Sequence, residues 1–264
     1  VPMSEDVWHL LKEQRISDTY YKRGSGKATQ ELEWLEATHR NWVHDIIDLS
    51  DFPYCYVTNG TTDAIHLWLY KEDRQWQYLQ GEYEYPNLID AGTEACIGYK
   101  KTFIDPHKVL YMSNPSAADG NFFDMEVNCP VVLDCTYISS TNIQTINVPP
   151  KTEQVFFSFS KGFGLIGQRL GLVYTKEPHK ILHTLKQFEN WNYNSVKTMD
   201  FIMANYDVDS MHNEYSSKQL DLCNEYDLNA SDCFFLATSQ DDYYKKRRRM
   251  KYNPIARLCL TPLW

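Results

Sequence analysis

The sequence has no long hydrophobic run, no excess of positive charge and no cysteine spacing typical of a metal site. Crossing a bilayer takes roughly 20 consecutive apolar residues. Since no such run and no signal-like N-terminal pattern is present, we expect a soluble, cytoplasmic protein without a membrane partner. The net charge of −9 argues against general affinity for nucleic acid, because a phosphate backbone repels an acidic surface. Seven cysteines, an odd number, favour reduced thiols and no metal ligation.

The pattern of elements predicts an α/β protein. The chain has 264 residues, of which 43% are apolar, so it can bury a sizeable core. Short apolar strands alternate with helices and loops from about residue 51 to 175, which predicts a mainly parallel sheet. We expect helices elsewhere at 3–16, 29–49 and across 177–226, and strands near 233–236 and 255–260.

The segment 158–171, SFSKGFGLIGQRLG, carries the most chemical information. A lysine amine in an electropositive, partly desolvated site can lose its proton near neutral pH, as a carbonyl cofactor requires. Hydroxyls at Ser158 and Ser160 and the planar guanidinium of Arg169 are suited to a phosphate. The alternative is an ordinary surface loop between two apolar runs, because short motifs often arise by accident.

This segment resembles the lysine segment of fold-type I pyridoxal-phosphate (PLP) enzymes, the aspartate aminotransferase superfamily. The resemblance implies a three-layer αβα large domain and a reduced α+β small domain. It also implies that Lys161 holds PLP as a Schiff base while Ser158, Ser160 and Arg169 contact the cofactor. Domain bounds follow as an N-terminal arm with helices at 1–50, a PLP-binding core at 51–175, and connecting helices with the small domain at 176–264.

Further pieces of the family pattern appear in the family's order. Strand 54–58 leads into a turn that opens a helix, and helix N-termini bind anions. By resemblance Gly60, Thr61 and Thr62 contact the cofactor phosphate, although Gly-Thr-Thr-Asp is also a common helix cap. Tyr85 is expected to stack on the pyridine ring, with Tyr83 as the neighbour that could replace it.

The remaining assignments concern the ring substituents and the substrate. Asn114, in an Asn-Pro turn, would contact the phenolic oxygen and the substrate. Asp134, near the carboxyl end of a buried strand, would keep the pyridine nitrogen protonated, and Tyr137 would lower the Schiff-base pKa. Arg257 would bind the substrate carboxylate as a bidentate pair, and Tyr21 would contact the substrate, in the family from the partner subunit.

The resemblance implies an aminotransferase acting on an α-amino acid and a 2-oxo acid through Lys161, as a homodimer with its site at the interface. A PLP-dependent lyase or decarboxylase is the first alternative, because the same constellation serves those reactions. A non-catalytic PLP-binding scaffold is the second. The chain is short for the family, so we expect both the helical connections of the large domain and the small domain to be shorter than usual. The basic run 245–249 is predicted to be a solvated connection, with a polyanion patch as the alternative.

Overall fold

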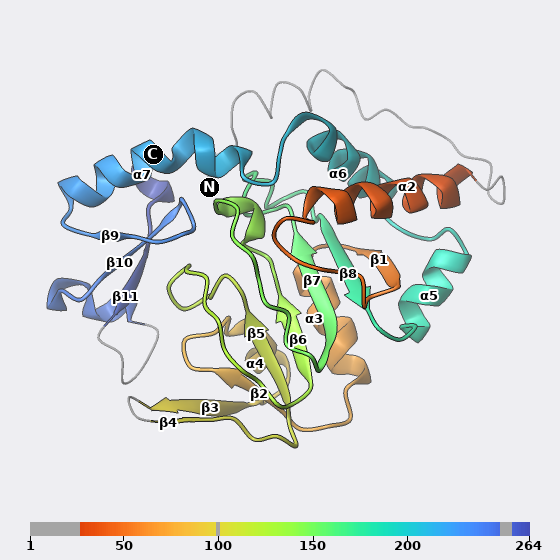
Figure 1. Cartoon of the computed structure of the whole chain (residues 1–264), viewed down its shortest axis with the longest axis horizontal. Coiled ribbons are helices and arrows are strands. Elements are labelled where there is room, and N and C mark those ends of the chain that lie inside the picture. The colour runs from red at the N-terminus through yellow and green to blue at the C-terminus, as the bar shows by residue number, and fades with distance from the viewer. Residues whose placement is uncertain (1–26, 99–100, 249–254) are drawn as a thin grey trace.

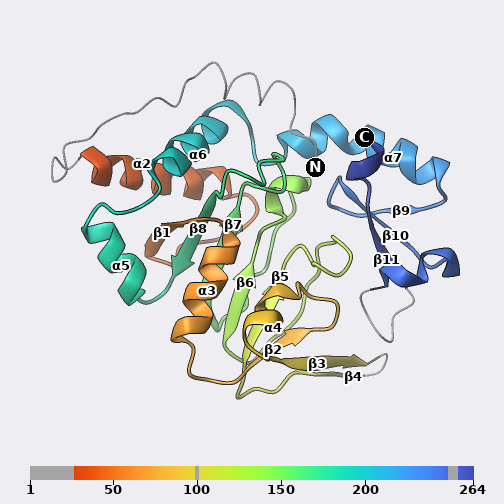
Figure 2. The same cartoon turned by 180° about the vertical axis from the view of Figure 1, so that it is seen from behind.

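A computed structural model describes residues 27–98, 101–248 and 255–264 of the chain. The helix predicted at 3–16 lies outside these residues. Within them the chain forms a large sheet covered by helices on both faces and a smaller sheet covered by one helix (Figures 1 and 2). The prediction of an α/β fold with three layers is confirmed.

The large sheet has eight strands in the order β1-β8-β7-β6-β5-β2-β3-β4. Neighbouring strands from β7 to β3 run parallel, whereas β8 lies antiparallel between β1 and β7, and β4 is antiparallel to β3. Strands β5, β6 and β8 are buried along their whole length, as expected for strands covered on both faces. The bounds are β1 Tyr54–Thr58, β2 Trp76–Leu79, β3 Thr93–Gly98, β4 Lys101–Phe103, β5 Val109–Ser113, β6 Val131–Asp134, β7 Thr152–Ser158 and β8 Gly171–Thr175.

Helices pack on both faces of this sheet. On one face, α2 (Lys27–Trp42) and α6 (Tyr193–Asn205) lie side by side and share the larger apolar core. On the other face, α3 (Thr61–Lys71) and α5 (Lys180–Gln187) bury their apolar side chains against the strands. The short α4 (Tyr85–Ile89) lies beside α3, as Figure 2 shows.

The smaller sheet follows the large one in the chain. Its order is β11-β10-β9, all antiparallel, and α7 (Ser210–Glu225) packs against it. Gln219 of α7 is buried and donates from Nε2 to the carbonyls of Ser231, Cys233 and Leu236, which ties the helix to the sheet. The bounds are β9 Asn229–Ala230, β10 Leu236–Ser239 and β11 Ala256–Cys259, with 3-10 turns η1 Ile138–Ser140, η2 Asp242–Arg247 and η3 Thr261–Leu263.

Three predicted elements differ from the structure. The helix predicted at 29–49 ends at Trp42, because the apolar residues beyond it enter the core from turns and Ile47 pairs with Ile146. The helical stretch 177–226 is broken into α5, α6 and α7. The strand expected near 233–236 begins only at Leu236. The described part of the basic run, Lys245 to Arg248, lies in and after η2 at the surface.

Candidate active site

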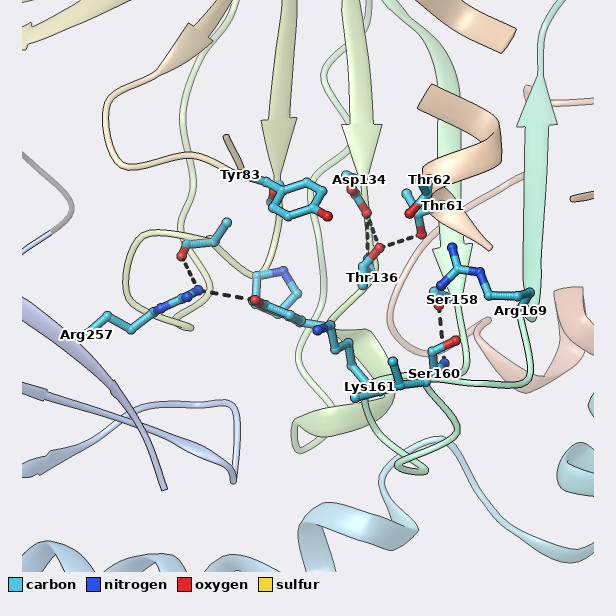
Figure 3. Close-up of a pocket in the computed structure, with 15 residues that line it drawn as sticks. Thr61, Thr62, Tyr83, Asp134, Thr136, Ser158, Ser160, Lys161, Arg169 and Arg257 are labelled. Carbon is cyan, nitrogen blue, oxygen red and sulfur yellow. Dashed lines mark hydrogen bonds between the residues drawn. The ribbon is translucent and has the colours of Figure 1, made fainter. Parts of the chain in front are cut away.

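One cavity of about 370 Å³ lies at the edge of the large sheet where strands β1, β5, β6 and β7 end. Parallel strands of open α/β sheets carry their ligand sites at this carboxyl edge. Figure 3 shows side chains from several strand ends, from the start of α3 and from β11 pointing into one space. The lining residues are Thr61, Thr62, Tyr83, Ser113, Pro115, Ala117, Asp134, Thr136, Tyr137, Ser158, Ser160, Lys161, Ile166, Arg169 and Arg257.

The start of α3 forms one wall of the cavity. Thr61 and Thr62 are its first two residues, and the unpaired amides at a helix N-terminus favour an anion. Gly60 precedes them with φ 77° and ψ 173°, a conformation that glycine adopts and other residues avoid. A Cβ there would lie 3.0 Å from Nη2 of Arg169. Gly60 therefore leaves room for the guanidinium beside the helix start.

Two serines, Ser158 and Ser160, add hydroxyl groups to the cavity lining beside the start of α3. Ser158 Oγ donates to the Leu170 carbonyl (3.2 Å) and accepts from the Ser160 amide (3.2 Å). The Ser160 hydroxyl is buried and has no hydrogen-bond partner within the described residues. A buried polar group without a partner is unfavourable unless a ligand satisfies it. Ser160 Oγ, the guanidinium of Arg169 and the α3 amides line the same cavity and are suited to an anion, so we call this set of groups the anion cup.

A buried carboxylate, Asp134, lies at the end of β6. Its Oδ2 accepts from the Tyr111 hydroxyl at 2.5 Å, and its Oδ1 accepts from the amide and hydroxyl of Thr136 at 2.9 and 2.5 Å. Desolvation raises the pKa of Asp134, and the hydrogen bonds from Thr136 and Tyr111 oppose that shift. The Thr136 hydroxyl also lies 2.7 Å from that of Thr61, which links the carboxylate to the anion cup.

Lys161 follows β7 in a tightly packed turn. A Cβ on the next residue, Gly162, would lie 2.1 Å from the Ser139 carbonyl oxygen, so only glycine fits there. Across the cavity, Nη1 of Arg257 donates to the Ala117 carbonyl (2.7 Å) and to the Tyr137 hydroxyl (3.2 Å) (Figure 3). An amine, a phenol and a guanidinium thus line the same cavity.

A second buried carboxylate, Glu82, lies behind the cavity wall. It accepts from the Ser113 amide (2.7 Å), the Ser113 hydroxyl and the Tyr83 amide (2.8 Å). Burial raises the pKa of Glu82, and the negative charge of Asp134 raises it further against these hydrogen bonds. Glu82 therefore joins the end of β5 to the loop that carries Tyr83.

Most residues predicted for the site line this cavity. They are Thr61, Thr62, Asp134, Tyr137, Ser158, Ser160, Lys161, Arg169 and Arg257. Gly60 lies behind the lining against Arg169.

Three other predicted residues are not in the lining. Tyr85 hydrogen-bonds His66 through its hydroxyl (2.7 Å), and Tyr83 lines the cavity in its place. Asn114 is buried, and its side-chain amide donates to the Phe123 carbonyl (2.9 Å). Tyr21 lies outside the described residues.

Five other lining residues are not among those predicted from the sequence. They are Ser113, Pro115, Ala117, Thr136 and Ile166. The signal for Thr136 was available, because it lies inside the Asp134-x-x-Tyr137 pattern directly after the strand. Ser113 and Pro115 are likewise neighbours of an expected site residue, Asn114. The cavity is therefore lined by sequence neighbours of the predicted residues as well as by the predicted residues themselves.

Neither a protein-family model nor a curated protein sequence matches the chain. Several solved structures, in contrast, are similar to the chain. A histidinol-phosphate aminotransferase from Sinorhizobium meliloti, in complex with pyridoxal-5'-phosphate, is similar with a TM-score of 0.66 at 13% identity, over 96% of this chain and 82% of that one. This chain has the fold of fold-type I PLP enzymes.

Two similar structures have other activities. An L-threonine-O-3-phosphate decarboxylase from Porphyromonas gingivalis has a TM-score of 0.65 at 13% identity, over 98% of this chain and 93% of that one. A PLP-bound C-S lyase from Staphylococcus hominis has a TM-score of 0.63 at 12% identity, over 92% and 72%. The shared fold is thus compatible with several reactions. None of the helices in the described ranges is long and apolar enough to cross a membrane.

Proposed function

We propose that this protein is a PLP-dependent aminotransferase that moves an amino group between an α-amino acid and a 2-oxo acid. One observation carries the proposal: Lys161, the buried carboxylate of Asp134 and the anion cup all line the same cavity. Those are the three groups that PLP requires, for its aldehyde, its ring nitrogen and its phosphate.

The residues of the cavity fit the cofactor. The phosphate would be held by Ser160 Oγ, which otherwise lacks a partner, by the α3 amides and by Arg169. Within the described residues no carboxylate forms an ion pair with Arg169, so its charge is available to an anion. Asp134 would face the ring nitrogen, and Tyr83 would lie against the ring.

Each side chain then has a task in the reaction. When bound, PLP supplies an aldehyde that condenses with amines and a ring that accepts electrons from a bond broken at the substrate's Cα. Nζ of Lys161 would hold the cofactor and later carry a proton to or from that Cα as general acid and base. Arg257 would bind the substrate's carboxylate, and Tyr137 would donate to the cofactor's phenolic oxygen.

The first experiment tests cofactor binding. The purified protein is mixed with PLP, and the near-visible absorption band of the lysine-bound cofactor is recorded. We expect the band in the wild type and in Lys180→Ala, an exposed lysine at the start of α5, and its loss in Lys161→Ala. A band that survives in Lys161→Ala would refute the assignment of Lys161.

The second experiment tests the reaction. With a ¹⁵N-labelled amino acid and a 2-oxo acid, transamination yields a ¹⁵N-labelled second amino acid. Release of ammonia or CO₂ without that transfer would instead favour a PLP-dependent lyase or decarboxylase, the activities of two similar structures. A band that no amino acid alters would favour a non-catalytic scaffold.

The proposal includes four further features, namely a dimer, a location, a substrate contact and a division into domains. Two copies would form a homodimer with the active sites at their interface, in the cytoplasm, and Tyr21 would contact the substrate. Residues 1–50, 51–175 and 176–264 would form the arm, the cofactor-binding core and the small domain. The dimer, the substrate contact and the domain bounds are supported by the family resemblance, and the location is supported by the composition and cysteine content. Sedimentation velocity of the PLP-loaded protein tests the dimer: a monomer that retains full activity would contradict it.

A further inference from the structure

Tyr111 is a buried tyrosine in β5 that no functional motif of the sequence includes. Its side chain has no measurable exposure, and its ring stacks on that of Trp68 with centroids 5.7 Å apart and planes 14° from parallel. The fixed ring aims its hydroxyl at Oδ2 of Asp134, 2.5 Å away. Burial raises the pKa of Tyr111 well above its usual value, so the hydroxyl keeps its proton and remains a donor.

Asp134 needs such a donor if it is to stay ionised. Burial favours the neutral carboxyl, whereas hydrogen bonds from Tyr111 and Thr136 favour the carboxylate. The other buried carboxyl nearby, Glu82, takes its hydrogen bonds from Ser113 and Tyr83 and supplies no donor to Asp134. Among the cationic groups, Lys161, Arg169 and Arg257 line the same cavity, but no ion pair with Asp134 is present within the described residues.

We propose that Tyr111 is a positioning residue that keeps the proton shared between Asp134 and the cofactor on the ring nitrogen. This inference rests on the proposed function. A proton between a carboxylate and a pyridine nitrogen goes to the stronger base. Donors to the carboxylate make it the weaker base, so the nitrogen keeps the proton and its positive charge. Without the Tyr111 hydroxyl, the proton moves toward Asp134 and the ring becomes a poorer electron acceptor.

The test measures where the proton lies. Wild-type protein and Tyr111→Phe are loaded with PLP labelled with ¹⁵N in the ring, and the ¹⁵N chemical shift is recorded, since protonated and unprotonated pyridine nitrogens differ widely in shift. We expect a protonated nitrogen in the wild type. In Tyr111→Phe we expect the equilibrium to move toward the unprotonated form by about tenfold or more, the effect of losing one hydrogen bond to a charged group.

Two further variants make the result specific. Tyr56→Phe removes another buried hydroxyl from the same core, one that contacts His179 and His183 and not Asp134, and should leave the shift unchanged. Thr136→Val removes the hydroxyl donor to Oδ1 at a half-buried position, and it replaces Tyr111→Phe if that variant does not fold. It should move the shift in the same direction.

The outcomes separate this inference from the proposed function. If the wild type does not bind PLP, the proposed function itself fails. If the wild type binds PLP but the shifts of Tyr111→Phe and Thr136→Val equal the wild-type shift, Tyr111 has only a packing role and the inference is wrong. An equal change in Tyr56→Phe would also overturn it, since it would show a general effect of core hydroxyls.

Discussion

Gly60→Ala should damage stability and phosphate binding together. Gly60 has φ 77° and ψ 173°, and an L-residue held in that region costs about 1–3 kcal/mol. The new methyl group would also lie 3.0 Å from Nη2 of Arg169, so the guanidinium has to move away from the start of α3. If Arg169 binds the phosphate as proposed, a displaced guanidinium would lose a charge-assisted hydrogen bond to it. A loss of about 1.5–3 kcal/mol weakens PLP binding roughly 10- to 150-fold.

Two assays separate the effects. Urea unfolding of the cofactor-free protein measures stability, and titration with PLP and with pyridoxal, which lacks the phosphate, measures affinity. We expect weaker binding of PLP and a much smaller change for pyridoxal. The matched control is Gly167→Ala, because a methyl group there meets no atom within 4 Å. If Gly60→Ala lowers the affinities for PLP and pyridoxal equally, the guanidinium does not bind the phosphate and the reasoning is refuted.

Three more predictions concern single side chains. The pKa of His39 is lowered from 6.5 to about 3 by burial first and the charge of Arg40 second, so its contribution to stability is complete above pH 6.5 and is lost as pH falls toward 3. By pH 5 the loss is about 2 kcal/mol, and urea unfolding of His39→Gln should show a weaker pH dependence. Tyr83→Ala should shift the absorption band of bound PLP and Tyr85→Ala should not; equal shifts would contradict the placement of Tyr83 in the cavity. Arg257→Gln should raise KM for the amino acid at least tenfold while PLP affinity stays within twofold, and an unchanged KM would remove Arg257 from substrate binding.

The large-domain core could be predicted from sequence because its signals are local. Strand 54–58 was placed at its observed bounds, and the segment from Ser158 to Arg169 has a spacing that determines which residues can reach one ligand. Those residues line a common cavity because the strand ends that carry them meet at one sheet edge. Hydrophobic periodicity predicts where the strands end, and short motifs predict which residues follow those ends.

Other features depend on contacts between distant residues. Tyr83 and Tyr85 are two residues apart in a similar local sequence, and what separates them is the start of α4 at Tyr85 and its hydrogen bond to His66. The apolar pattern after Trp42 continues at helical spacing, although Ile47 pairs with Ile146, about a hundred residues away. Tyr111 reads as one more apolar strand residue until Asp134 is placed opposite its hydroxyl.

The antiparallel pairing of β7 and β8 determines which part of the loop between them can change in length. Because β8 runs against β7, Ser158 pairs with Gly171, and the segment between them is a hairpin loop whose two ends are held by sheet hydrogen bonds. The groups next to those ends, Ser158 and Arg169, are therefore fixed independently of the length of the loop tip. Insertions near the exposed Gly167 should be tolerated by the anion cup while reshaping the cavity mouth at Ile166. The loop tip is thus a position where the cavity could be altered without rebuilding the anion cup.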